Sequence, residues 1–365
     1  LIVNPISGMG GKVGLKGTDG EEILKLALRL GAKPISPCRA KNFLRGLRSL
    51  EGLQIITYPR EMGESEAIEV SYKPTVIGSI AHGMSTGNDT RNAARQMMER
   101  GVSIIVFVGG DGTARDVCDA VGNTIPVLGV PAGVKAYSAV FAINPQSASQ
   151  IAVRYIGGEL PLHEAEVMDV DEEAFRRGRL AAKLYGYLKV PYEPGQVQSS
   201  KTASLQAADE RENQKAIAKH IVEEMEADCF YIIGPGTTTK AITDALGANK
   251  TLLGVDVVRN RRLVAADVRE EEILSLVKDR KAKIVVSPLG GQGYLLGRGN
   301  QQISPAVIAG VGKKNVVVVA TEQKILSLDP RRLLVDTGNP EVDERFRGYI
   351  KVLADYRKYE VVKVE

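Results

Sequence analysis

Hydrophobic and polar positions along the chain predict repeated strand–helix units. Continuous apolar runs rich in β-branched residues predict buried strands at residues 1–3, 54–57, 75–80, 103–108, 126–130, 229–233, 283–287 and 315–320, with shorter ones at 333–337 and 361–364. Apolar residues at intervals of three and four predict amphipathic helices at 21–30, 88–100, 145–154, 207–227 and 237–246. Strands that alternate with helices imply a parallel sheet with helices on its faces.

This order predicts an α/β protein with three regions. Residues 1–158 are expected to form an N-terminal, doubly wound parallel sheet, and residues 159–320 a second, mixed α/β domain that contains a glycine loop at 287–305. Residues 321–365 are expected to pack back on these domains. A stretch rich in Pro, Ser, Gly and Gln, at 191–206, predicts an exposed loop or linker.

The segment that carries the most chemical information follows the strand at 103–108. It reads GGDGT, with Gly109, Gly110 and Gly112 around Asp111 and with Thr113 at the end. A strand that leads through glycines into a helix directs backbone N–H groups at one point, beside the positive end of the helix dipole. Without Cβ atoms, a phosphate chain can approach that backbone closely. The segment predicts phosphate binding.

Asp111 is the one acidic group inside this motif. A carboxylate repels phosphate, so the prediction is a different role: a general base for a hydroxyl, or a partner of a phosphate-bound Mg²⁺. Together with the glycines this combination predicts phosphoryl transfer.

Two further loops have similar composition. After the first strand come Asn4, Ser7, Gly8, Gly10 and Gly11, which could equally form an ordinary turn. After the strand at 229–233 come residues whose small size and hydroxyl groups suit an anion, although one threonine could simply cap the helix: Gly234, Gly236, Thr237, Thr238 and Thr239. Asp256, 20 residues after Gly236 and at the end of the next predicted strand, has the spacing of a ribose-binding carboxylate.

Composition restricts the partners. The 365 residues are 44% hydrophobic and 25% charged, with 48 basic and 44 acidic side chains and a net charge of +4. Without a dense basic stripe nucleic acid is not an expected partner, and no apolar run has membrane-spanning length. The three cysteines are far apart and the chain shows no leader, so we expect free thiols and a cytoplasmic protein.

The GGDGT motif resembles the hallmark of the NAD kinase and diacylglycerol/lipid kinase superfamily, in which its aspartate is the favoured catalytic base. The NPISG loop at 4–8 resembles the start of the lipid kinases of that superfamily. The segment after the strand at 126–130 resembles their PxGTxN loop, which makes Gly133 and Lys135 candidates for the site, Lys135 either as a phosphate ligand or as a solvated lysine. Asp116 stands where lipid kinases often have a glutamate, or it is a solvated carboxylate.

Residues 287–305, SPLGGQGYLLGRGNQQISP, resemble the NAD kinase segment TPTGSTAYSLSAGGPIVHP without a gap. In NAD kinases this loop contacts the NAD substrate, so the resemblance implies that Gly290, Gly291, Gln292 and Tyr294 do so here. Gly291, Gln292 and Gly293 replace a small STA stretch, which implies a different pocket. Arg298 adds a cation that could serve this loop or a salt bridge.

The chain is most similar to the divergent branch of predicted ATP-NAD or polyphosphate-NAD kinases and acetoin-catabolism X-like proteins. The Asn-Glu pair expected after GGDGT is missing. The resemblance implies transfer of a phosphoryl group from ATP or polyphosphate, with Mg²⁺ on its phosphates, to a hydroxyl of NAD. The alternatives are a kinase for a lipid or small polyol and a non-catalytic nucleotide-binding regulator. The expected partners are small nucleotides, and relatives are commonly homo-oligomers.

Overall fold

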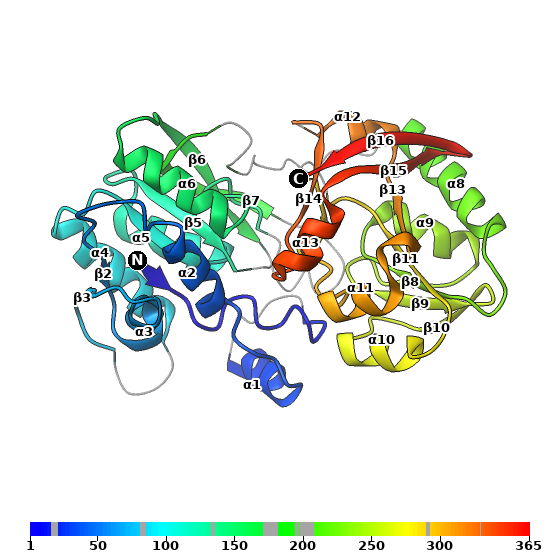
Figure 1. Cartoon of the computed structure of the whole chain (residues 1–365), viewed down its shortest axis with the longest axis horizontal. Coiled ribbons are helices and arrows are strands. Elements are labelled where there is room, and N and C mark those ends of the chain that lie inside the picture. The colour runs from blue at the N-terminus through cyan, green and yellow to red at the C-terminus, as the bar shows by residue number, and fades with distance from the viewer. Residues whose placement is uncertain are drawn as a thin grey trace. The chain divides into compact units, whose positions relative to one another are not determined.

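The chain divides into two compact units, each with its own sheet and helices (Figure 1). The computed structural model describes residues 1–15, 21–80, 85–132, 136–170, 182–193, 197, 208–289, 293–328 and 330–365. The first unit consists of Leu1–Met9 and Gly17–Lys201, and the second of Gly10–Lys16 and Thr202–Glu365. The chain therefore leaves the first unit after Met9 and returns to it at Gly17.

The first unit is built on a parallel sheet with strand order β1-β4-β5. Its elements, in chain order, are β1 (Ile2–Val3), α1 (Glu21–Arg29), α2 (Ser36–Arg45), β2 (Ile56–Thr57), η1 (Arg60–Met62), α3 (Glu64–Glu69), β3 (Thr75–Val76), α4 (Gly87–Glu99), β4 (Ile105–Gly109), α5 (Asp111–Val121), β5 (Val127–Pro131), α6 (Pro145–Ile156), β6 (Leu162–Val170) and β7 (Ala182–Pro191). β2 and β3 form a parallel pair, and β6 and β7 an antiparallel hairpin.

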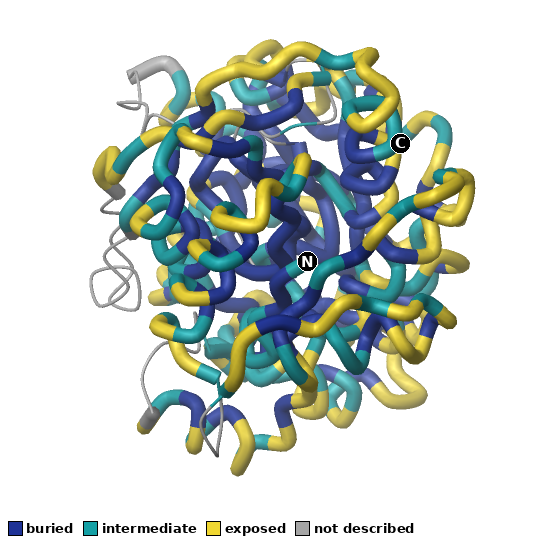
Figure 2. The backbone as a smooth tube through the Cα atoms, turned by 90° about the vertical axis from the view of Figure 1, so that its left-hand side faces the viewer, coloured by how far each residue is buried: buried dark blue, intermediate teal, exposed yellow. Residues whose placement is uncertain are grey.

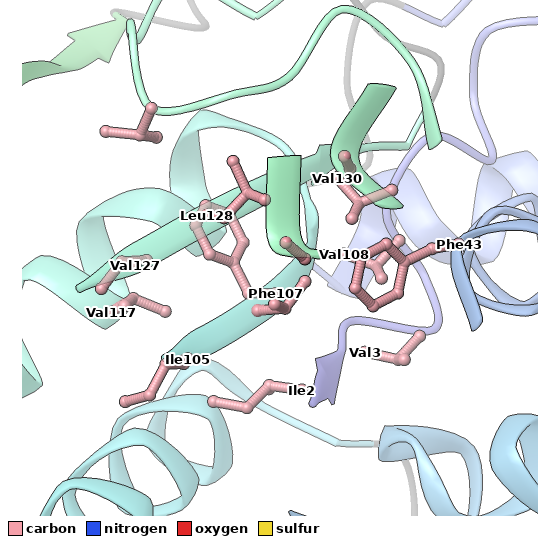
Figure 3. Close-up of a cluster of buried hydrophobic side chains, with 14 of the residues drawn as sticks. Ile2, Val3, Phe43, Ile105, Phe107, Val108, Val117, Val127, Leu128 and Val130 are labelled. Atoms are coloured by element: carbon pink, nitrogen blue, oxygen red, sulfur yellow. The ribbon is translucent and has the colours of Figure 1, made fainter. Parts of the chain in front are cut away.

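The core of the first unit lies between the sheet and two pairs of helices. Helices α4 and α5 pack together and against β4, while α2 and α6 pack together and against β5. All five residues of β4 are buried, and Figure 3 shows Phe107 and Val108 among side chains from β1, β5, α2 and α5. A strand buried on both faces explains why its sequence is continuously apolar instead of alternating.

The second unit holds a nine-stranded mixed sheet of order β10-β9-β8-β11-β13-β15-β16-β14-β12. Strands β8, β11, β13 and β15 run parallel, and β9 and β16 are antiparallel to β8 and β15. The elements are α8 (Ala208–Glu223), β8 (Phe230–Ile233), α9 (Thr237–Ala245), β9 (Asp256–Arg259), β10 (Arg262–Ala265), α10 (Glu270–Val277), β11 (Ala282–Val286), β12 (Tyr294–Leu296), α11 (Pro305–Val311), η3 (Lys313–Asn315), β13 (Val316–Val319), α12 (Glu322–Leu326), β14 (Arg332–Val335), α13 (Pro340–Phe346), β15 (Gly348–Asp355) and β16 (Lys358–Val364).

Figure 2 shows the buried stretches of the chain in dark blue. In the second unit, α10 and α11 pack together, and α9 packs with α8. Two clusters of buried apolar side chains result, one that includes residues of α10 and α11 and one that includes residues of α8 and α9. The predicted fold class, a parallel α/β domain followed by a mixed α/β domain, is confirmed.

Several details differ from the sequence-based expectation. The expected boundary lies after residue 158, whereas the hairpin of β6 and β7 packs against α5 and β5 and so joins the first unit. The expected C-terminal segment, 321–365, supplies β14, β15 and β16 to the sheet of the second unit. Asp256 begins strand β9 instead of ending a strand. The predicted linker at 191–206 lies mostly outside the described residues.

Two further observations concern the described helices and the cysteines. Among the described helices, none combines the length and the apolar character that a membrane crossing requires. Cys38, Cys118 and Cys229 are all free thiols.

Candidate active site

Three loops of the first unit begin at one edge of its sheet. Val3 of β1 pairs with Val108 of β4, and Gly109 at the end of β4 pairs with Pro131 at the end of β5. Because the three strands are parallel, their carboxyl ends meet at the same edge, which is where open α/β sheets bind ligands. The NPISG, GGDGT and PAG segments all follow these ends.

Asn4 joins the first two loops. Its backbone N–H donates to the carbonyl of Val108 at 3.0 Å, and its side-chain Nδ2 donates to Oγ1 of Thr113 at 2.9 Å. Its Oδ1 accepts from the N–H of Ile6 at 3.3 Å, which folds the loop into a turn of the kind asparagine favours. The asparagine thus fixes the NPISG loop against the first turn of α5.

Gly8 brings the same loop close to the third one. It has a φ of +80°, and a Cβ at this position would lie 2.1 Å from the carbonyl oxygen of Ala132. Ser36 of α2 holds the preceding residue, because its hydroxyl donates to the carbonyl of Ser7 at 2.9 Å. Only glycine combines this backbone conformation with so close an approach.

The GGDGT segment forms the turn from β4 into α5. A Cβ on Gly109 would lie 2.4 Å from Oγ1 of Thr113, so this position also requires glycine. Gly110 precedes the helix in an extended conformation, and Asp111 is the first helical residue. The first N–H groups of an α-helix have no partner within the helix and can bind an anion. The strand, glycine turn and helix start on which the phosphate-binding prediction depends are therefore present, and phosphate binding itself stays a prediction.

The Asp111 carboxylate is held by the loop that follows β5. Oδ1 accepts hydrogen bonds from the N–H of Ser138 at 2.8 Å, from the hydroxyl of Ser138 at 2.6 Å, and from the N–H of Tyr137 at 3.1 Å. Oδ2 accepts only from the N–H of Tyr137, at 2.9 Å, among the hydrogen bonds of the described residues. Oδ2 can therefore accept a further hydrogen bond, from the hydroxyl of a bound molecule.

The environment of Asp111 acts on its pKa in two directions. Burial raises the pKa of the carboxyl above its ordinary value and is the largest cause, while the hydrogen bonds from Ser138 and Tyr137 oppose that rise. A carboxylate with a raised pKa is a stronger base while the donors keep it ionised. Asp111 as a residue is intermediate in exposure, so part of it remains accessible to solvent.

Gly10 and Gly11 belong to the second unit. The N–H of Leu15 donates to the carbonyl of Gly10 at 2.9 Å. A Cβ on Gly11 would overlap the side chain of Gln301, 1.3 Å from its Oε1. Gly11 therefore serves close packing within the second unit, to which Gly10 also belongs, and Asn4, Ser7 and Gly8 remain with GGDGT in the first unit.

The GPGTTTK segment forms the turn from β8 into α9. Gly236 precedes the helix with a φ of +117°, and Oγ1 of Thr239 donates to its carbonyl at 3.0 Å. Oγ1 of Thr237 accepts from Nε2 of Gln214 at 3.4 Å. A Cβ on Gly234 would lie 3.0 Å from Val286, so this glycine lets β8 and β11 lie close together.

Comparison with known protein families decides what this arrangement belongs to. Residues 1–160 match the model of the ATP-NAD kinase N-terminal domain, and residues 226–364 match that of the ATP-NAD kinase C-terminal domain. The chain belongs to the NAD kinase-like superfamily. Searches of curated proteins and of solved structures gave no match. The two models cover most of the chain in the order expected for this superfamily of kinases.

The segment that resembles the NAD-contacting loop of the superfamily is described only in part. Tyr294 is buried, with its ring 4.2 Å from the Arg298 guanidinium, and Arg298 forms an ion pair of 3.2 Å with Asp336. Arg298 therefore takes the salt-bridge role. The contacts with NAD stay predictions, since the other members of the set, Gly290, Gly291 and Gln292, lie outside the described residues, as do Gly133 and Lys135.

Two further acidic candidates have partners within the protein. Asp116 forms an ion pair with Arg91 of α4. Asp256 is fully buried and accepts hydrogen bonds from the N–H groups of Thr251 and Asp267, and it lies 3.4 Å from Nζ of Lys250. Both carboxylates therefore have a structural role, because each one pairs with a cation of the protein itself.

The resemblance to the superfamily implies Mg²⁺ on the donor phosphates, so the side chains that could bind a metal ion matter. Throughout the described ranges no group of three or more His, Cys, Asp or Glu side chains is placed to hold a metal. Mg²⁺ often binds through one or two carboxylates together with substrate phosphates. Asp111, whose Oδ2 accepts a single hydrogen bond among the described residues, has the donor chemistry to contact a Mg²⁺ ion bound to nucleotide phosphates.

Sequence reasoning did not find Tyr137 and Ser138, the residues that orient Asp111, nor Lys324, which contacts the GPGTTTK turn. Tyr137 and Ser138 lie 26 and 27 residues after the aspartate, with no local motif. Lys324 could have been identified from the sequence, because it comes soon after the predicted strand at 315–320, just as the other candidate residues come soon after predicted strands.

Proposed function

We propose that this chain transfers a phosphoryl group from ATP or polyphosphate to a hydroxyl of NAD. The observation that carries the proposal is the orientation of the Asp111 carboxylate at the start of α5, where Oδ1 accepts three hydrogen bonds from Ser138 and Tyr137 and Oδ2 accepts one, from Tyr137. A base for a hydroxyl must be fixed in position and must keep a free lone pair.

The donor phosphates bind to the N–H groups at the start of α5 and along the loop of Asn4, Ser7 and Gly8. Three features support this: the glycine at 109, the bond from Asn4 to Thr113 and the close approach of Gly8 to Ala132. Mg²⁺, when bound, neutralises phosphate charge. Phosphoryl transfer depends mainly on positioning and charge stabilisation.

Asp111 accepts the proton of the acceptor hydroxyl through Oδ2 as the new O–P bond forms. The bond between the terminal phosphorus and the leaving oxygen of the donor breaks in the same step, and the proton leaves Asp111 to solvent afterwards. The raised pKa favours proton acceptance, and the three donors on Oδ1 stabilise the ionised form from which the cycle starts.

The test measures NADP formed from NAD with Mg·ATP and, separately, with Mg·polyphosphate, by means of an NADP-specific dehydrogenase. Asp111→Asn should lower kcat by about 10²–10⁴-fold, the range of general base catalysis, while the Kd of the nucleotide changes little. Asp119→Asn is the matched control, since Asp119 is an exposed residue of the same helix that accepts from Tyr185.

Other outcomes would separate the alternatives. Turnover of Asp111→Asn at the wild-type rate would refute the role of the carboxylate. Labelling of a lipid or polyol from labelled ATP, with NAD unchanged, would refute NAD as the acceptor. Tight nucleotide binding without any product would identify a non-catalytic regulator.

A further inference from the structure

A second set of strand ends converges in the second unit. Strands β8, β11 and β13 are parallel neighbours, with Ile233 paired to Val285 and Val286 paired to Val318. Their carboxyl ends therefore lie at one edge of the nine-stranded sheet. The GPGTTTK turn follows β8, Ser287 follows β11, and α12 begins shortly after β13.

Lys324 of α12 connects these three segments. Its Nζ donates to Oγ of Ser287 at 3.1 Å and to Oγ1 of Thr238 at 3.5 Å. Thr238 is fully buried and Ser287 is 2% exposed, whereas Lys324 is half-buried. An ammonium group has three N–H donors, and the hydrogen bonds to described residues use two of them. The lysine is thus the group of this cluster that an incoming molecule can reach.

Lys324 has an acidic neighbour, Glu210, but forms no ion pair with any of the described residues. Within the described part of the chain no carboxylate oxygen lies within 4.0 Å of its Nζ. Burial lowers its pKa from 10.5 to about 8, and the charge of Glu210 on α8 has a smaller, opposite effect. Glu210 accepts a hydrogen bond from Thr321 at 3.3 Å.

Lys250 of the same unit shows which partners surround a buried lysine with a purely structural role. Its Nζ donates to the carbonyls of Thr251 and Gly254 at 2.8 and 3.0 Å and lies 3.4 Å from the Asp256 carboxylate. A desolvated cation is costly unless it is paired. Lys324, whose contacts with described residues are neutral hydroxyls, therefore keeps a charge that a bound anion would neutralise.

The surroundings of Lys324 select the kind of anion. Thr238 lies in the first turn of α9, where the backbone N–H groups have no helical partner. A cation held by two buried hydroxyls, beside helix N–H groups, matches the charge and the oxygens of a phosphate group. A Ser–Lys nucleophile pair would use the same contact, but Ser287 is too buried for a substrate to reach.

We propose that Lys324, held in place by Ser287 and Thr238, and the first turn of α9 form a binding site for a phosphate group in the second unit. The ligand is a phosphate monoester or the end of a phosphate chain, from a nucleotide or from polyphosphate. The site adds Lys324 and Ser287 to the predicted GPGTTTK loop, and it does not depend on the role proposed for Asp111.

The test is calorimetric titration of the full chain with inorganic phosphate, tripolyphosphate and ATP. Lys324→Met should weaken binding of tripolyphosphate at least tenfold, and Lys324→Arg, which keeps the charge, should recover part of the affinity. Lys240→Met is the control, because Lys240 lies in the same segment but pairs with Asp244 on the surface. Tighter binding of ATP than of tripolyphosphate would assign the site to a nucleotide, and the reverse to polyphosphate.

The pH dependence gives a second readout. Phosphate favours the charged lysine, so affinity should fall as pH rises through about 8, the pKa of the ligand-free lysine, and this fall should be lost in Lys324→Met. Lys324→Met should fold with unchanged or greater stability without ligand, since it removes a desolvated charge.

Wild-type affinity in Lys324→Met, or no binding of any probe to the wild type, would overturn the phosphate site. Asp111→Asn should bind tripolyphosphate at the Lys324 site like the wild type. The two proposals can therefore fail separately, one through catalysis in Asp111→Asn and the other through binding in Lys324→Met.

Discussion

The hydroxyl of Ser138 donates a hydrogen bond of 2.6 Å to Oδ1 of Asp111, across 27 residues of sequence. The same oxygen atom of Ser138 accepts from the N–H of Met168 at 2.9 Å. Ser138 therefore links the carboxylate at the start of α5 to strand β6. Its removal should affect both the ionisation of Asp111 and the stability of the first unit.

Ser138→Ala tests this relationship through a pH profile. The hydrogen bond from Ser138 lowers the pKa of Asp111, so its loss should raise that pKa and move the acidic limb of kcat/KM to higher pH. Stability should fall by roughly 1–3 kcal/mol, because the N–H of Met168 loses its acceptor. Ser149→Ala is the matched control: Ser149 is a buried serine bonded to the carbonyls of Phe43 and Pro145. An unmoved acidic limb in Ser138→Ala would contradict the role of Asp111 as the base.

Gly8→Ala should disrupt the NPISG loop. The substitution places a Cβ 2.1 Å from a backbone carbonyl, and it also forces alanine to a φ of +80°. Gly31→Ala isolates the second effect, because Gly31 has a φ of +79° and open space around it. Gly31→Ala should cost about 1–2 kcal/mol, and Gly8→Ala clearly more, with a higher KM for the phosphate donor. Urea unfolding and donor titrations measure both, and equal costs would show that the loop can move away from Ala132.

The bond between Asn4 and Thr113 can be measured with a double-mutant cycle. Asn4→Leu, Thr113→Val and the double variant should give a coupling free energy of about 0.5–1.5 kcal/mol in urea unfolding, since both groups lose one shared hydrogen bond. Asn4→Leu combined with Ser149→Ala should be additive within about 0.5 kcal/mol. A coupling energy of zero would mean that the two loops are held together by other contacts.

Glu66 of α3 should make stability depend on pH. It is 3% exposed, and burial raises its pKa from 4.5 to about 7. The folded chain then retains this proton between these values while the unfolded chain loses it, so this group lowers stability as pH rises from 4.5 to about 7. Glu66→Gln should be more stable than the wild type at alkaline pH, by on the order of 2–3 kcal/mol, and similar to it in acid.

Thermal unfolding of Glu66→Gln at both ends of this range measures the difference. Glu51→Gln changes an exposed carboxylate and serves as the control. A constant difference between Glu66→Gln and the wild type across the whole range would rule out titration of Glu66.

Local sequence was sufficient to predict the elements whose conformation depends on neighbouring residues in the chain. The continuous apolar run at 103–108 predicted a buried strand, found as β4, because a strand covered on both faces has no polar positions. The glycines at 109 and 110 predicted the turn into α5, because that turn leaves no room for a Cβ at Gly109. The order of strands and helices was sufficient for the α/β class.

Elements with weaker local patterns were missed. Helix α2, Ser36–Arg45, mixes basic and polar residues with its buried face, and β15, Gly348–Asp355, gains its strand conformation from pairing with β16 and β13. The strand predicted at 75–80 is only Thr75–Val76 in the structure. In these cases the partner in space, and not the segment itself, decides the conformation.

The sequence by itself determined the fold class, the glycine turn at GGDGT and the candidacy of Asp111, because each depends on residues that are neighbours in the chain. Only the tertiary structure decided which oxygen of Asp111 accepts fewer hydrogen bonds, that Asp116, Asp256 and Arg298 have ion-pair partners, and that Lys324 lies against Ser287 and Thr238. These contacts join segments that are distant in sequence and that leave no local pattern. Hydrogen bonds and burial depend on distances in space, which the sheet sets when it brings the ends of its strands together.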